Sequence, residues 1–422
     1  MSNVTLDRTD LSRGLGDLLG RARSASRALA RADRNAALVA IAEGVLGRRT
    51  DVLAANAEDV AAERAKGTSD ALLDRLTLSE TRLQEIADAV RQVAALPDPL
   101  HRVLADWTLP NGLEVRKVSV PFGVVGMIYE SRPNVTVDAA VLALKAGSAA
   151  VLRGSANALR SNRVLAAAMR EALGRAGLPE DAVQLIDSPD RRFVTELLSA
   201  RGLVDLVIPR GGASLISHVV ETAKVPVIET GTGNCHIFVD ASADLERAKG
   251  IVLNAKVQRP GVCNAVETLL VHQDVAETFL PEMLGALSEA GVTLRGCERT
   301  RAIFSTDAAT ETDWETEYLD LELAVRVVAS LDEAVTHINC YGTQHSEAIL
   351  TASDENARRF QDEVNAAAVY VNASTRFTDG FEFGFGAEIG ISTQKLHARG
   401  PVGLTELTTY KYLLDGQGQI RD

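Results

Sequence analysis

Short apolar runs alternate with helix-like segments from residue 123 onward, and this alternation limits the possible folds more than any other feature. Residues 123–129 are apolar, and a helix-like segment follows at about 135–146. The pattern continues with expected strands at 149–152, 183–187, 204–208 and 225–229, separated by expected helices at 156–175, 190–201 and 213–223. Such alternation predicts a parallel sheet with right-handed crossovers. Sheets of this kind bind ligands outside the carboxyl ends of their strands.

A second alternating series begins near Cys235 and continues to about Val371. Two consecutive series predict two α/β domains with a cleft between them. The first hundred residues lack this alternation and are rich in Ala and Leu. Residues 77–80 have capping-box spacing before a run of helical period, so we expect this region to form a helical packing layer.

The segment 103–120 interrupts the α/β pattern. Asn111-Gly112 lies between two extended runs, which is a strong signal for a β-hairpin. The hairpin is either an arm that pairs with another subunit or a plain surface hairpin.

The composition excludes several classes of protein. The 422 residues carry a net charge of −13, which argues against a nucleic-acid binder and requires local cations for any anionic ligand. The four cysteines form no CxxC pair, so a zinc ribbon is not expected. The sequence shows neither a signal peptide nor a long uncharged apolar stretch, and we expect a cytoplasmic protein without a membrane span.

Cys263 is the candidate nucleophile. Pro260 and Gly261 precede it, and a sharp turn of this kind can expose a thiol at a cleft. A thiolate is the strongest nucleophile that a side chain offers at neutral pH. The alternative is a buried and inert cysteine, which is also the interpretation for Cys235, Cys297 and Cys340.

Several polar groups follow the expected strands. Asn134 is either a helix N-cap or an oxyanion donor. The segments 153–155 and 210–212 place an arginine and glycines before expected helices, which is typical of an anion site for a phosphorylated cofactor. Glu229 is either a base or a hydrogen-bonded carboxylate. Arg376, Lys395, His397 and Arg399 lie in loops, where they bind phosphate or carboxylate, or pair with Asp379, Glu382 and Glu388.

The order of these segments resembles the aldehyde dehydrogenase superfamily, and within it the enzymes that reduce gamma-glutamyl phosphate. The segments that carry the resemblance are 129–134, 145–147 with 151–155, 208–212, 229–236, 258–264, 317–321, 374–377 and 386–409. One departure is Gly261, where such enzymes more often have Ser.

The resemblance implies an aldehyde-dehydrogenase-like α/β fold of two doubly wound domains with a small β oligomerisation element. The expected parts are a cofactor-binding domain at 1–102 and 121–228, a catalytic domain at 229–372, substrate or phosphate loops at 373–399, and oligomerisation segments at 103–120 and 400–416. It implies Cys263 as the nucleophile and Asn134 as the oxyanion-hole amide. The implied cofactor-binding residues are Arg153, Gly154, Ser155, Arg210, Gly211, Gly212 and Glu229. The implied substrate-binding residues are Arg132, Arg259, Arg376 and Arg399. No metal is expected.

The implied reaction is the NADPH-dependent reduction of L-glutamyl 5-phosphate to L-glutamate 5-semialdehyde in proline biosynthesis, through a thioester on Cys263. NADP is the expected cofactor, because the arginines suit its phosphates. We expect a homo-oligomer (dimer or tetramer), channelling with glutamate 5-kinase, and neither a nucleic-acid nor a membrane partner. Two alternatives stay open: a hydrolytic aldehyde dehydrogenase with Glu229 as base, and a catalytically inactive binding protein with the same fold.

Overall fold

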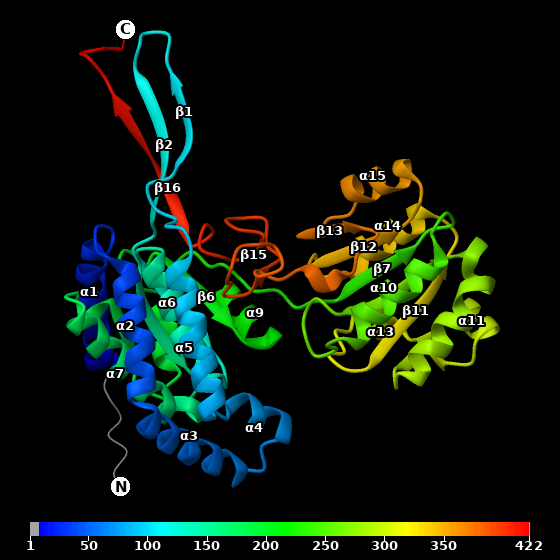
Figure 1. Cartoon of the computed structure of the whole chain (residues 1–422), viewed down its shortest axis with the longest axis horizontal. Helices are drawn as coiled ribbons and strands as arrows, with labels where there is room; N and C mark the ends of the chain where they lie inside the picture. Colours follow the sequence, from blue (N-terminus) through cyan, green and yellow to red (C-terminus); the bar gives the residue numbers. More distant parts are fainter. Residues whose placement is uncertain (1–7, 422) are drawn as a thin grey trace. The chain divides into compact units, whose positions relative to one another are not determined.

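The computed structural model describes residues 8–421, which form two compact units (Figure 1). The first unit runs to Glu229 and takes in Phe385–Gly390 and the segment from Val402 onward. The second unit comprises Thr230–Gly384 and Ile391–Pro401. Each unit is therefore discontinuous in sequence, and each contains its own parallel sheet.

The sheet of the first unit has four parallel strands in the order β5-β4-β3-β6. Every residue of β3 and β4 is buried, as expected for strands covered on both faces. The elements are β3 (Val124–Tyr129), α6 (Pro133–Lys145), β4 (Ala149–Gly154), α7 (Leu159–Arg175), β5 (Val183–Leu185), α8 (Arg192–Leu198), β6 (Leu206–Arg210) and α9 (Ala213–Thr222). The predicted alternation of strands and helices is confirmed here.

The strand predicted at 225–229 is wrong. This segment forms only an isolated bridge between Val207 and Val227. Pro226 has no N–H to donate, so the segment cannot continue a regular ladder.

The predicted helical layer is confirmed. Helix α5 (Glu80–Ala95) begins after Ser79, whose hydroxyl accepts the N–H of Arg82. The cap is therefore Ser79 rather than Thr77, which opened the predicted capping box. The other helices of the layer are α1 (Arg8–Leu29), α2 (Arg34–Gly47), α3 (Arg49–Arg64) and α4 (Asp70–Leu76).

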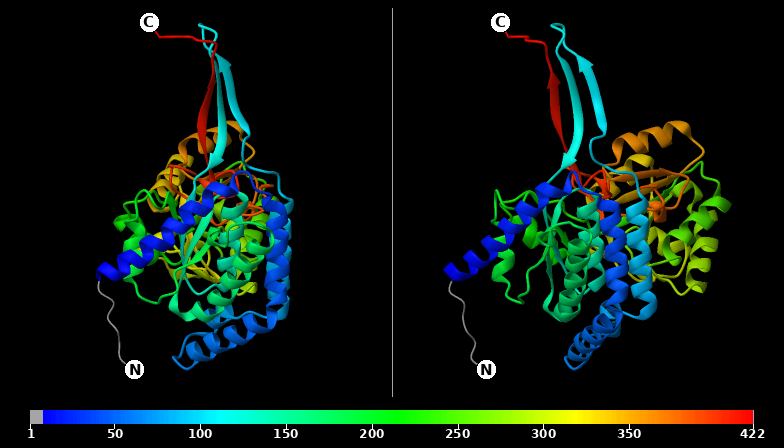
Figure 2. Two further views of the ribbon diagram at one scale, coloured as in Figure 1. Left: turned by 90° about the vertical axis from the view of Figure 1, so that its left-hand side faces the viewer. Right: turned by 60° about the vertical axis from the view of Figure 1, so that its left-hand side comes forward.

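A three-stranded antiparallel ribbon extends from the first unit (Figure 2). The hairpin predicted at 103–120 is confirmed as β1 (Val103–Thr108) and β2 (Glu114–Pro121), and β16 (Thr408–Asp415) pairs with β2. Trp107 meets Tyr412 edge-to-face, with ring centroids 6.1 Å apart. Both aromatic residues remain about half exposed.

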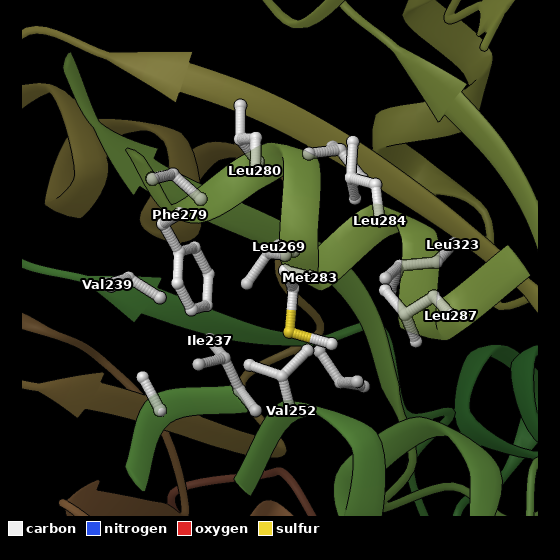
Figure 3. Close-up of a cluster of buried hydrophobic side chains, with 14 of the residues drawn as sticks. Ile237, Val239, Val252, Leu269, Phe279, Leu280, Met283, Leu284, Leu287 and Leu323 are labelled. Atoms are coloured by element: carbon white, nitrogen blue, oxygen red, sulfur yellow. The ribbon is translucent and has the colours of Figure 1, made fainter. Parts of the chain in front are cut away.

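The second unit is built on a seven-stranded parallel sheet of order β10-β9-β11-β8-β7-β12-β13. Phe279 and Met283 of α11 pack against Ile237 and Leu269 of the sheet and Val252 of α10 (Figure 3). The strands are β7 (Cys235–Val239), β8 (Val266–His272), β9 (Thr293–Gly296), β10 (Asp307–Ala308), β11 (Glu322–Val328), β12 (Ser346–Leu350) and β13 (Ala368–Val371). The helices are α10 (Leu245–Val257), α11 (Gln273–Glu289), α12 (Glu298–Ile303), α13 (Glu311–Glu315), α14 (Leu331–Tyr341) and α15 (Asp354–Glu363).

The short strands β14 (Ile391–Ser392) and β15 (Gly400–Pro401) pair antiparallel within the second unit. Among the helices of residues 8–421, none combines the length and apolar character needed to cross a membrane.

Candidate active site

Cys263 lies in the turn 258–264, between α10 and β8 of the second unit, and is half-buried. Because β7 and β8 are neighbours, Cys235 at the start of β7 lies close to this turn. Its Sγ donates a hydrogen bond to the carbonyl oxygen of Cys263 over 3.2 Å. Cys235 is fully buried, and burial raises the pKa of its thiol, which keeps it neutral. Cys235 therefore supports the turn, and Cys263 is the more accessible of the two thiols.

Gly233 packs directly against the main chain of Cys263. A Cβ on Gly233 would lie 1.5 Å from the carbonyl oxygen of Cys263 and 2.3 Å from its carbonyl carbon, so only glycine fits. The N–H of Gly233 donates to Oε1 of Glu317 over 2.7 Å. Burial raises the pKa of Glu317, while this hydrogen bond opposes the increase. The backbone at Gly233 is thus held on one side by Glu317 and packs against the cysteine on the other.

A buried ion pair supports the segment that carries Glu317. Lys256 and Glu267 are both fully buried, with 2.6 Å between Nζ and Oε2. The other carboxylate oxygen of Glu267 accepts the N–H of Leu319 over 3.3 Å, and Leu319 has a left-handed φ of 56°. Burial raises the pKa of Glu267 to about 7, and burial also lowers the pKa of Lys256. The pair ties the turn at 317–319 to β8 and α10.

Arg376 is bound to the residue that follows Cys263. The side-chain amide of Asn264 donates to the carbonyl oxygens of Arg376 (3.2 Å) and Thr378 (2.9 Å). Nε of Arg376 donates to the Gln258 side chain over 2.8 Å. Burial lowers the pKa of Arg376, the charge of Arg259 lowers it further, and Cys263 raises it. The structure therefore places Arg376 in the electrostatic surroundings of the candidate nucleophile, and Arg259 in those of Arg376.

A polar pocket of about 230 Å³ adjoins this turn. Its lining consists of Asn254, Gln258, Arg376, Phe377, Asp379 and Glu382. It contains a cation, two carboxylates and two amides within a single unit.

Asn134 lies in the first turn of α6, in the first unit. The N-cap of this helix is Arg132, and Pro133 occupies the first helical position, so the N-cap interpretation of Asn134 is wrong. Its Nδ2 donates to Oδ2 of Asp138 over 3.0 Å. Burial raises the pKa of Asp138 to about 6, although this hydrogen bond and the charge of Arg210 oppose the increase. The Asn134 amide has two N–H groups, so one remains available to a second acceptor.

The turn after β4 is largely occupied by contacts within the protein. Arg153 is buried and donates to the carbonyl oxygens of Gly154 (2.9 Å) and Pro189 (3.2 Å). A Cβ on Gly154 would lie 2.2 Å from Nδ2 of Asn162, so this glycine is required by interior packing. The hydroxyl of Ser155 accepts the N–H of Ser131 over 2.9 Å, which joins this turn to the one after β3.

The turn after β6 leads into a helix that has no side-chain cap. The N–H of Gly212 donates to Oε2 of Glu130 over 2.9 Å. Helix α9 then begins without a side-chain cap, because Gly212 has no side chain to provide one.

A family model described as "Aldehyde dehydrogenase family" matches residues 19–297. The chain belongs to the aldehyde dehydrogenase family. A protein named gamma-glutamyl phosphate reductase from Moorella thermoacetica is 60% identical over 405 residues, covering 95% of this chain and 97% of that protein. One of the same name from Thermobifida fusca is 58% identical over 417 residues, covering 98% and 100%. The crystal structure of gamma-glutamyl phosphate reductase from Thermotoga maritima has a TM-score of 0.95 at 51% identity, covering 97% of this chain and 100% of that one.

Membership of the aldehyde dehydrogenase family makes the chain an oxidoreductase with a nicotinamide cofactor. The residues present fit the phosphates of such a dinucleotide. The strand order of the first sheet reverses between β3 and β6, and their carboxyl ends meet there. Dinucleotides bind at such a point, and the uncapped start of α9 adjoins it.

The other predicted site residues differ in their surroundings. Arg132 occupies the N-cap position of α6 without a side-chain capping hydrogen bond. Glu229 is half-buried at the last residue of the long N-terminal part of the first unit. Arg399 donates to the side chains of Asn365 (2.8 Å) and Gln344 (3.2 Å). These contacts hold Arg399 to the loops around β12.

Sequence reasoning missed the roles of Gly233, Glu317 and Asp138. Gly233 packs on the main chain of Cys263, a contact that no local pattern in the sequence indicates. Glu317 lies in one of the segments that carried the family resemblance, so a signal for it was available. For Asp138 the signal was its position four residues after Asn134 in a predicted helix, where side chains meet.

Proposed function

We propose that the chain catalyses the NADPH-dependent reduction of L-glutamyl 5-phosphate to L-glutamate 5-semialdehyde, with release of phosphate, in proline biosynthesis. The observation that carries the proposal is the Cys263 turn, held by Gly233 and Asn264 next to two arginines. Relatives between 54% and 60% identical are named gamma-glutamyl phosphate reductase, and we take the identity of the substrate from this name. As a biosynthetic enzyme, it would work in the cytoplasm.

In the first step the thiolate of Cys263 attacks the acyl carbon of the substrate. The tetrahedral oxyanion then collapses, the bond between carbon and the phosphate oxygen breaks, and phosphate leaves with its electron pair. A thioester on Cys263 results. Arg376 places positive charge near the thiolate, which favours its formation, and together with Arg259 on the same turn it favours the approach of an anionic substrate.

In the second step the thioester is reduced and the aldehyde is released. When bound, the reduced nicotinamide supplies the hydride for this step. The oxyanion of the resulting thiohemiacetal re-forms the carbonyl group, and the carbon–sulfur bond breaks to restore the Cys263 thiolate. No proton has to be delivered to the leaving sulfur in this direction.

For Asn134 the proposed role as oxyanion donor comes from the family resemblance. Asp138 supports it, because accepting one N–H of the amide fixes its orientation and leaves the other N–H as a donor. We assign NADP to Arg210, Gly211 and Gly212, where α9 starts uncapped. Arg153 and Gly154 instead hold the turn after β4 in place.

Glu229 has no required role in phosphate release, because phosphate is a good leaving group. A general base at this position would activate a water molecule to hydrolyse a thioester. That reaction belongs to the alternative function, a hydrolytic aldehyde dehydrogenase. Changing Glu229→Gln is expected to spare the proposed reaction and to abolish the hydrolytic one.

We further propose a homo-oligomer, a dimer or tetramer, formed through the ribbon of β1, β2 and β16. The exposed side chains of Trp107, Tyr412 and Leu414 on this ribbon support an interface there. Glutamate 5-kinase would supply the acyl phosphate, and channelling would protect it from water.

The reverse reaction tests the proposed function. Purified protein, NADP and glutamate 5-semialdehyde should yield NADPH only when phosphate is added. Turnover that does not need phosphate would favour the hydrolytic function instead. Cys263→Ala should eliminate turnover without unfolding the protein, and equal inactivity of both forms towards every aldehyde would favour a binding protein.

A further inference from the structure

The polar pocket beside the Cys263 turn contains charges of both signs. Asn254 and Gln258 contribute amides from the end of α10 and the start of the turn, and Arg376 contributes the cation. Asp379 and Glu382 contribute carboxylates from the loop that follows. A ligand that matched this lining would carry an anionic group and a cationic group close together.

The guanidinium of Arg376 keeps donors available to a ligand. Its Nε donates a hydrogen bond of 2.8 Å to the neutral side chain of Gln258. This bond fixes the orientation of the guanidinium plane. The two Nη groups lie at the other end of the same fork, the geometry that binds a carboxylate in bidentate fashion. Arg376 is thus oriented without being neutralised by Gln258.

The two carboxylates have separate surroundings. Oδ1 of Asp379 accepts the N–H groups of Phe381 (2.8 Å) and Glu382 (3.4 Å), which holds the loop in shape. The side chain of Glu382 is exposed at the pocket. Two carboxylates disfavour a phosphate group with two negative charges and favour an ammonium group.

An α-amino acid has this combination, with a carboxylate and an ammonium on one carbon. We propose that the pocket binds the α-amino acid group of the substrate, with Arg376 at the α-carboxylate and Asp379 and Glu382 at the α-ammonium. The inference rests on the proposed function and assigns Arg259, on the turn itself, to the phosphate. Three carbon–carbon bonds separate the α-carbon of a glutamyl group from its reacting carbonyl carbon, so the pocket has to lie near the nucleophile. Gln258 of the Cys263 turn lines the pocket, and the charge of Cys263 acts on Arg376 in the same lining.

The pocket would make the enzyme selective for aldehydes and acyl phosphates that carry the amino acid group. An analogue without the ammonium offers the two carboxylates no cation, and one without the carboxylate offers the Nη groups of the guanidinium no anion. We expect kcat/KM to fall by about 10²-fold when the ammonium is removed, and by a similar factor when the carboxylate is removed as well.

The test compares three aldehydes in the phosphate-dependent oxidation: glutamate 5-semialdehyde, 5-oxopentanoate, which lacks the ammonium, and pentanal, which lacks both groups. Glu382→Gln and Asp379→Asn should each reduce the preference for glutamate 5-semialdehyde over 5-oxopentanoate about tenfold. Arg376→Met should lower kcat/KM for both carboxylate-bearing aldehydes far more than for pentanal.

Matched controls come from α15, away from the pocket lining. Glu355→Gln and Arg358→Met remove exposed charges there and should leave every ratio unchanged. Unchanged ratios in Glu382→Gln and Asp379→Asn would overturn the proposal. Glu382 is exposed, so its variant should fold even where Asp379→Asn disturbs the loop.

A binding experiment separates this inference from the proposed function. L-Norvaline has the same five-carbon chain without a reactive group, and pentanoate lacks its ammonium. L-Norvaline should slow the alkylation of Cys263 by iodoacetamide at concentrations where pentanoate does not, and Glu382→Gln should remove the difference. This result would support the pocket even if turnover proved independent of phosphate, and equal effects of the two compounds would contradict it.

Discussion

Gly233→Ala adds only one methyl group, yet it should displace Cys263 and strongly reduce activity. The added Cβ would lie 1.5 Å from the carbonyl oxygen of Cys263, whereas an ordinary carbon–oxygen contact is about 3.3 Å. One of the two backbones therefore has to move by nearly 2 Å. A misplacement of about 1 Å at a reacting group can cost about 10²-fold in rate, so we expect kcat/KM to fall by at least that factor. Overpacking should also lower the free energy of unfolding by about 1–3 kcal/mol.

The assay has three readouts: phosphate-dependent NADPH formation, the rate of Cys263 alkylation, and urea unfolding. Gly250→Ala is the matched control, because it adds the same methyl group in α10 with no atom within 4 Å of the new Cβ. It should keep activity and gain about 0.5–1 kcal/mol of stability from its helical position. If Gly233→Ala stayed folded with activity and alkylation within a few-fold of the parent protein, the packing argument would be refuted.

Three further predictions concern charged groups. Arg376→Met should shift the pH midpoint of Cys263 alkylation upward, because a cation that favours the thiolate is lost; an unchanged midpoint would exclude this effect. Lys256→Met should lower the free energy of unfolding by about 3–5 kcal/mol in a denaturant titration, since it leaves the Glu267 carboxylate buried alone, and adding Glu267→Gln should recover part of the loss. Burial raises the pKa of Asp138 from 3.8 to about 6, so the folded protein holds this proton more tightly than the unfolded chain, and the associated stability is lost as the pH rises through that interval. Asp138→Asn removes the titration, so its stability relative to the parent protein should increase between pH 4 and pH 7 in urea unfolding, and a constant difference would contradict the assignment.

The sequence was sufficient to predict the arrangement of strands and helices in the first sheet. Strands such as 124–129 are buried throughout, and a run that is apolar at every position carries this information locally. The exception, 225–229, has the same apolar character, but its proline removes a donor that a regular ladder needs. The proline could have excluded this strand from the sequence alone, but the prediction gave more weight to the apolar character of the segment.

The candidate site was predicted less completely because its contacts join distant parts of the chain. The Cys263 turn was found from the adjacent proline and glycine, which act locally. The hydrogen bond between Gly233 and Glu317 spans 84 residues, and that between Gly212 and Glu130 spans 82. No spacing in the sequence indicates such pairs.

The location of the nucleophile also departs from the general rule for parallel sheets. Ligands were expected at the carboxyl ends of the strands, yet the Cys263 turn precedes β8 and Gly233 precedes β7. The candidate chemistry in the second unit therefore lies at the amino ends of two neighbouring strands. The rule concerns strand–helix crossovers that open a crevice, whereas here a turn after a helix presents the residue.

The discontinuity of the first unit has a consequence for biosynthesis. Strand β16 follows every other element of the chain and pairs along the whole length of β2, from Glu114 to Pro121. During translation the hairpin of β1 and β2 emerges early, and nearly three hundred further residues are synthesised before β16 leaves the ribosome. Until then one edge of β2 presents unpaired N–H and C=O groups, so nascent chains on neighbouring ribosomes are at risk of joining edge to edge.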